Sequence, residues 1–149
     1  MFGRLFRTNN DITPLILRLF LGVVIFPHGA QKALGLFGGY GFSGTIGFFT
    51  QNMGLPLVLA LLVIAAEFLG SIGLITGFLT RLSAFGIASV MTGAIFIVHT
   101  PNGFFMNWSG KQAGEGFEFH LLAIGIALVL VITGGGGLSI DGLISQKSN

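Results

Sequence analysis

The sequence predicts an all-α integral membrane protein, a four-helix bundle with both termini on the cytoplasmic side. Two features of composition favour this class. Of the 149 residues, 52% are hydrophobic and only 8% are charged, against about 25% charged in an ordinary soluble domain. The mean hydropathy is +0.90 and the chain contains 25 glycines, which membrane helices tolerate. A third feature is the presence of four apolar stretches long enough to span the hydrocarbon core of a membrane, which needs about 20 residues of helix.

These four stretches cover about residues 14–36, 55–76, 82–99 and 117–133. The segments between them, 37–54 and 100–116, are rich in Gly, Asn and aromatic residues, which favour loops. After four glycines at 134–137, Ser139 is expected to cap a short amphipathic helix that runs through Ile144. Since no linker divides the chain, we expect residues 1–149 to form a single domain.

The distribution of Lys and Arg predicts the orientation in the membrane. With four crossings, one side of the membrane has Arg4, Arg7, Arg81 and Lys147, with Arg18 just inside it, and the other side has Lys32 and Lys111. Positive residues accumulate on the cytoplasmic side, so we expect both termini there. No small-residue cleavage site follows the first apolar run, which we therefore expect to be retained as a span.

The absence of cysteine excludes several kinds of site. The chain can form no disulfide, no Cys-ligated zinc or iron–sulfur site, and no dithiol redox centre of its own. The 7 basic and 5 acidic residues are scattered along the chain and leave a formal charge of +2. This pattern contains no stripe for nucleic acid, so the expected surroundings are the lipid bilayer and other membrane components.

Helical spacing places polar and small residues on the same face of the first two spans. On the first span these residues are Arg18, Gly22, Ile25, Gly29 and Lys32, and on the second they are Ala66, Glu67, Gly70, Ser71, Gly73 and Gly77. Small residues mark the packing faces of membrane helices. We therefore expect both stripes to face the interior of the bundle.

Glu67 lies near the middle of its span. A charged side chain at that depth costs roughly 2.5 to 3.5 kcal/mol on insertion scales, so we expect it to be paired, protonated or in contact with water. Arg18 is the expected partner, because the predicted depths of the two residues differ by about 7 to 8 Å. Two interpretations of the pair remain open: a structural ion pair that sets helix register, or a carboxylate that binds a ligand or handles protons.

A second polar group is predicted near the outer ends of the spans: His28, Lys32, His99, Glu118 and His120. Three interpretations remain open, namely a metal or haem site, a polar mouth that admits a small ligand, or interfacial side chains bonded to loops. No pair has the i, i+3 or i, i+4 spacing of a strong local metal motif. The sequence therefore assigns no metal site.

The chain resembles the DoxX family of small bacterial four-span membrane proteins over nearly its whole length. The resemblance rests on Arg18 followed by the His28-Gly29-x-x-Lys32 stretch, and on Glu67 before a glycine-rich segment that ends in GFLTR at residues 77–81. It continues with Glu118 at the start of the last span and with the LSID tail at residues 138–141. One departure is the tail, which contains only glycines where the family often has Gly-Pro-Gly.

The resemblance implies membrane redox chemistry, as in the small subunit of a thiosulfate:quinone oxidoreductase or in partners of detoxifying and quinone-linked enzymes. The matched polar positions are Arg18, His28, Lys32, Glu67 and Glu118, with Asp141 on the tail, whereas the resemblance does not extend to His99 and His120. The leading hypothesis is a subunit or partner of a membrane oxidoreductase, with a buried polar pocket for a quinone-like molecule.

Electrons would have to come from another protein, because the chain contains no recognisable flavin or nicotinamide motif. The expected partners are therefore a membrane or membrane-associated protein or a second copy of this chain. Two other functions remain open. One is a non-catalytic membrane anchor or assembly subunit, and the other is a small transporter or channel.

Overall fold

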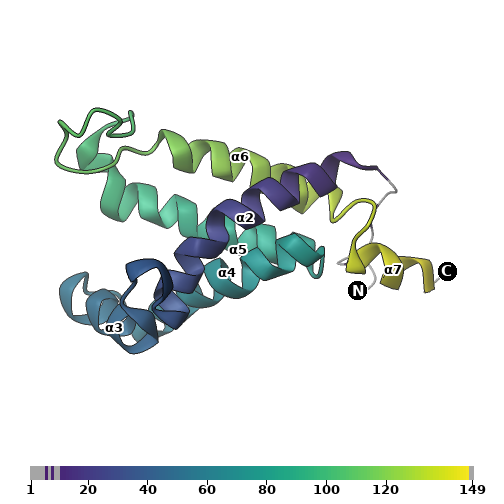
Figure 1. The fold of residues 1–149 in the computed structure, drawn as a ribbon, viewed down its shortest axis with the longest axis horizontal. Coiled ribbons are helices and arrows are strands. Elements are labelled where there is room, and N and C mark those ends of the chain that lie inside the picture. Colours follow the sequence, from purple (N-terminus) through teal and green to yellow (C-terminus); the bar gives the residue numbers. More distant parts are fainter. Residues whose placement is uncertain (1–5, 7, 9–10, 148–149) are drawn as a thin grey trace.

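The computed structural model describes residues 6, 8 and 11–147, and these are helices joined by turns and loops (Figure 1). Four long helices are α2 (Thr13–Leu34), α4 (Leu57–Thr76), α5 (Thr80–Ala94) and α6 (Glu118–Thr133), and two short ones are α3 (Gly41–Gly47) and α7 (Ile140–Lys147). Two π-helical segments, η2 (Phe48–Asn52) and η3 (Ile95–His99), continue α3 and α5, and 3-10 turns occupy η1 (Leu36–Gly38) and η4 (Thr100–Asn102). The all-α prediction is confirmed.

Three helical stretches are long and apolar enough to cross a membrane: Thr13–Leu34, Leu57–Thr76 and Thr80–Asn102. Helix α6 is also apolar but has 16 residues, or about 24 Å at 1.5 Å per residue. The fourth crossing and the side on which the termini lie stay predictions. Of the residues that predict orientation, Arg4, Arg7 and the side chain of Lys147 lie outside the described part of the chain.

The four long helices pack in the order α2, α4, α5 and α6, and α6 closes back onto α2 (Figure 1). The interior is apolar, with a core of Leu21, Ile25, Leu74, Ala84, Ile87, Ala88, Met91, Ala123, Ala127 and Leu130. Large apolar side chains on the outside, such as Phe20, Leu122 and Ile132, are exposed. An apolar core inside an apolar exterior is the arrangement expected when hydrocarbon is the solvent.

The predicted stripes of small residues do form the packing faces. A Cβ atom added to Gly29 would lie 2.6 Å from the Cα of Phe68, and one added to Gly22 would lie 3.1 Å from the carbonyl oxygen of Ser71. Both neighbours belong to α4, so α2 and α4 approach closely only because these positions lack side chains. This close packing brings the polar residues of the two stripes within reach of each other.

The two ends of the bundle differ, and we name them by their contents. The tail end holds α7 and the α4–α5 turn, and the loop end holds α3 and the 100–116 segment (Figure 1). At the loop end, residues 37–54 were expected to be a loop but contain α3 and η2. At the tail end, Ser139 Oγ accepts a hydrogen bond from the Gly142 N–H at 3.0 Å, which confirms the predicted cap of the tail helix.

Candidate functional site

Arg18 is 1% exposed and lies at the tail end of the bundle. Its guanidinium donates hydrogen bonds to four backbone carbonyls: Leu74 at 3.1 Å, Ile75 at 2.6 Å, Gly135 at 3.1 Å and Leu138 at 2.6 Å. Two of these carbonyls belong to the last turn of α4, where the helix leaves its acceptors unsatisfied. The positive charge also lies at the negative end of the α4 dipole.

Asp141 complements Arg18 from the other side of the same turn. Its two carboxylate oxygens accept hydrogen bonds from the N–H groups of Leu79 and Thr80, each at 2.8 Å, at the start of α5. A carboxylate at the positive end of a helix is stabilising. Arg18 and Asp141, which we call the tail-end clasp, thus join α2 and α7 to the α4–α5 turn by contacts within the chain.

The prediction that Arg18 pairs with Glu67 is wrong. The carbonyls that Arg18 binds begin at Leu74, seven residues beyond Glu67 along α4, or about 10 Å at the rise of an α-helix. Arg18 points toward the tail end, where helix ends offer several acceptors at once. Glu67 pairs instead with Lys32, the other cation on the same face of α2.

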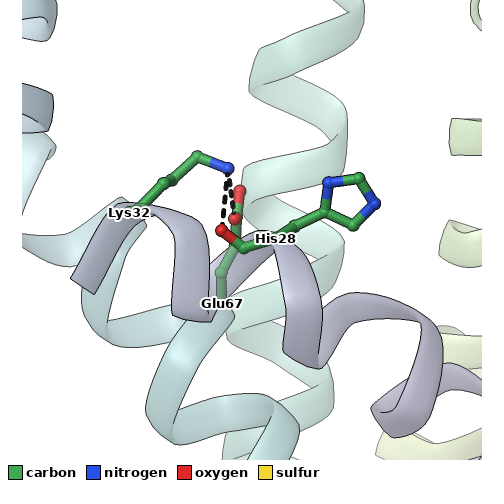
Figure 2. A network of polar contacts seen from close by, with 3 residues as sticks. All are labelled: His28, Lys32 and Glu67. Atoms are coloured by element: carbon green, nitrogen blue, oxygen red, sulfur yellow. Dashed lines mark hydrogen bonds and ion pairs between the residues drawn. The ribbon is translucent and has the colours of Figure 1, made fainter. Parts of the chain in front are cut away.

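Lys32 is the partner of Glu67. Its Nζ lies 2.6 Å from Glu67 Oε2, and it also donates a longer hydrogen bond of 3.4 Å to the carbonyl of His28 (Figure 2). The Glu67 side chain is 6% exposed and that of Lys32 is 24% exposed. The Glu67 side chain is therefore enclosed by the bundle, whereas the Lys32 side chain is partly exposed.

Lys32 also lines a pocket of about 280 Å³ at the loop end. Its lining residues are Gln31, Lys32, Gly38, Gly39, Tyr40, Thr45, Phe48 and Phe49. The rings of Tyr40 and Phe48 stack with centroids 6.2 Å apart. The pocket therefore combines aromatic walls with one cationic donor, whose counter-ion is buried behind it.

Sequence reasoning identified Lys32 but missed the rest of this pocket, because α3 and η2 were expected to be a loop. A local signal was present: Thr45, Phe48 and Phe49 have the i, i+3, i+4 spacing of one helix face. The surrounding glycines concealed it. Glycine favours turns in soluble proteins but is common in membrane helices.

The three histidines gather at the loop end in a second group, which we call the histidine cluster (His28, His99 and His120). The rings of His99 and His120 have centroids 4.0 Å apart and planes tilted by 42°. His120 is 7% exposed, and its Nδ1 atom is buried without a hydrogen-bond partner. His28 comes from α2 at the same end of the bundle, and its ring points away from Lys32 and Glu67 (Figure 2).

Glu118 belongs to neither group. Its Oε1 atom accepts hydrogen bonds from the Met106 N–H at 2.8 Å and from Trp108 Nε1 at 3.3 Å, so it anchors the 100–116 segment to α6. The predicted outer cluster therefore divides into three parts: Lys32 with Glu67, the histidines together, and Glu118 with the loop.

Among residues 11–147, no group of three or more His, Asp or Glu side chains is arranged to hold a metal ion. A haem between His99 and His120 does not fit either, because their rings touch and leave no room for a macrocycle. The residue types for these sites are present, but their geometry in this structure does not suit such ligands.

Comparison with known proteins gives two relatives and one family. A family model described as DoxX matches residues 13–100, more than half of the chain. The Bacillus subtilis (strain 168) protein named "Putative oxidoreductase CatD" is 30% identical over 131 residues, which cover 88% of this chain and 86% of the relative. The Escherichia coli (strain K12) protein named "Inner membrane protein YqjF" is 30% identical over 138 residues, 93% of this chain and 96% of the relative. No solved structure matches the chain.

Proposed function

The chain belongs to the DoxX family of membrane proteins, and on that premise we propose that it is a four-span inner-membrane subunit or partner of an oxidoreductase whose loop-end pocket binds a quinone-like molecule. The observation that carries this proposal is the position of Lys32, which pairs with the buried Glu67 and also lines a pocket with aromatic walls.

The pocket offers the two kinds of contact that a quinone head group needs. The ring packs against aromatic side chains such as Phe48 and Phe49. A carbonyl oxygen accepts a hydrogen bond from the Lys32 ammonium group, and a bond to a charged donor is stronger than one between neutral groups. Glu67, 2.6 Å from Lys32 Nζ, holds the donor in place and provides a carboxylate for proton exchange.

The role as a subunit or partner is supported by the residues of the chain itself. The sequence has no cysteine and no motif for an organic redox cofactor, so electrons would reach a bound quinone through another protein. The word "oxidoreductase" in the name of the B. subtilis relative favours the same class of system. The name of the E. coli relative favours the inner membrane.

Four crossings are supported by where the chain begins and ends in the bundle. The Gly137 N–H donates to the carbonyl of Asp11 at 2.8 Å, so the start of α2 and the end of α6 lie at the same end. An even number of passes returns the chain to the side from which it started. Arg81, near this end, donates to the carbonyls of Val131 and Ile132 and joins α5 to the last turn of α6.

The test is the quinone content of the purified protein and its affinity for a short-chain quinone in lipid nanodiscs. We expect Lys32→Gln and Glu67→Gln to weaken binding by about 10- to 100-fold, because a hydrogen bond to a charged group contributes about 1.5–3 kcal/mol. The matched control is Lys111→Gln, which changes an exposed lysine in the 100–116 segment and should leave binding unchanged.

Equal binding by wild type and both pocket variants, or no binding by any of them, contradicts the proposal. The same purification tests a second candidate, a membrane anchor or assembly subunit. The tail-end clasp favours this candidate, because it shows that the chain also buries charges for purely structural contacts. A stoichiometric protein partner without quinone would support the anchor, and solute flux into liposomes would support a transporter.

A further inference from the structure

The histidine cluster lies outside the proposed pocket, whose lining includes none of its three members. Each histidine comes from a different element: His28 from α2, His99 from the end of η3 and His120 from the first turn of α6. The π-helical segment that carries His99 is a rare form of helix, often found where function requires it. The contact between His99 and His120 therefore joins the loop end of the α5–η3 stretch to α6.

Among the described residues, no loop-end carboxylate is hydrogen-bonded to an imidazole of the cluster, because each of these carboxylates is engaged in another contact. Glu67 is paired with Lys32, Glu115 accepts from the Asn107 N–H at 2.6 Å, and Glu118 accepts from Met106 and Trp108. Lys32 adds positive charge near His28, because it lies one helical turn further along α2.

The two rings also differ in their hydrogen bonds. His99 Nδ1 is bonded to the carbonyl oxygen of Glu115 at 2.8 Å, which joins η3 to the 100–116 segment. His120 Nδ1 is enclosed and has no partner. A proton on that atom would be a buried donor without an acceptor, beside a second imidazole whose centroid is 4.0 Å away.

We propose that His99 and His120 form a proton-sensitive clasp, closed when both rings are neutral and opened by acid on the side of the membrane that the loop end faces. Neutral rings pack against each other and hold the end of α5 to α6. When both rings carry a proton, like charges at this distance in a poorly screened site repel more strongly than a ring contact attracts. The clasp then opens, and η3 and the 100–116 segment move away from α6.

The test uses the absence of native cysteine. Spin labels are attached to Ile97→Cys in η3 and Leu121→Cys in α6, two exposed positions within two residues of the histidines in sequence. The distance between the labels is then measured in lipid nanodiscs from about pH 8 to about pH 4, a range that brackets histidine titration in proteins. We expect a reversible shift to longer distances as the pH falls.

The matched control is the double variant His99→Phe/His120→Phe, which keeps two packed rings and every carboxylate but removes the titrating groups. We expect no shift in this variant, whereas His28→Phe should keep the shift because the contact between His99 and His120 is intact. If the double variant does not fold, His99→Phe alone is measured, and its shift should be smaller than that of the wild type, because one remaining histidine cannot form a like-charged pair.

Two results overturn the proposal. One is an unchanged distance in the wild type across the whole pH range. The other is a shift of equal size in the phenylalanine variant, which would assign the movement to carboxylates. Neither outcome depends on what the Lys32 pocket binds, so the clasp and the proposed function fail independently.

Discussion

Arg18 and Lys32 share one stripe of α2, yet each meets the acceptor that suits its own head group. A guanidinium has five donors in a rigid plane and satisfies several carbonyls at once, whereas an ammonium is a compact charge that suits one carboxylate. Arg18 accordingly binds four carbonyls at the tail end, and Lys32 binds Glu67. The charge of Arg18 thus has a structural role, whereas Lys32 pairs with Glu67 and lines the pocket.

We predict that Arg18→Lys lowers the free energy of unfolding by about 3–5 kcal/mol, because lysine keeps the charge but leaves several buried carbonyls without a donor. Thermal unfolding in detergent, followed by circular dichroism, measures the loss. Lys111→Ala, at an exposed position, should unfold like the wild type. An Arg18→Lys variant as stable as the wild type would show that these four hydrogen bonds contribute little.

At the scale of helices, the α2–α4 contact decides whether the Lys32–Glu67 pair forms. Gly29 lies between His28 and Lys32 in the sequence, and it packs directly on the backbone of α4 beside Glu67 and Phe68. The absence of a side chain there lets the two helices approach closely enough for a lysine to reach a buried carboxylate. The lack of a side chain at Gly29 therefore affects both how closely α2 and α4 pack and whether Lys32 reaches Glu67.

We predict that Gly29→Ala destabilises the bundle by about 1–3 kcal/mol, the usual cost of overpacking, because its Cβ would lie 2.6 Å from the Phe68 backbone. The matched control is Gly125→Ala on α6, where an added Cβ meets nothing within 4 Å and stability should be unchanged or slightly raised. Equal effects of the two changes in thermal unfolding would show that the close approach is unimportant.

For the molecule as a whole, the two ends of the bundle contain different kinds of side-chain contact. The tail end is closed by backbone carbonyls and N–H groups bound to Arg18 and Asp141, a set of contacts that fixes the helices relative to one another. The loop end holds the pocket, the Lys32–Glu67 pair and the histidine cluster. Its titratable groups would meet the outer solution if the predicted orientation holds.

That orientation gives a prediction for the intact molecule. In cells with a permeabilised outer membrane, an impermeant maleimide should label Lys111→Cys and leave Gln146→Cys unlabelled, because four crossings with cytoplasmic termini place these exposed positions on opposite sides. Lysed cells should label both variants. Labelling of Gln146→Cys alone in unlysed cells would mean that the bundle is inserted in the reverse orientation.

The sequence alone determined the solvent, the four long helices and the inner faces of the first two. Composition decides whether a chain dissolves in lipid, and the length of an apolar run decides whether it can form a long helix there. The spacing of Gly22, Gly29, Glu67 and Gly70 then determined which side of each helix faces inward, because an α-helix has a fixed period. None of these features depends on where one helix lies relative to another.

Only the tertiary structure decided which residues meet. Glu67 pairs with Lys32 and not with Arg18 because the relative depth and crossing of α2 and α4 place the carboxylate beside one cation and far from the other. The pocket formed by α3 and η2 and the contact between His99 and His120 depend likewise on how separate segments pack. Such contacts join residues far apart in the chain, and their geometry follows from packing in three dimensions, which a one-dimensional pattern of residue types does not contain.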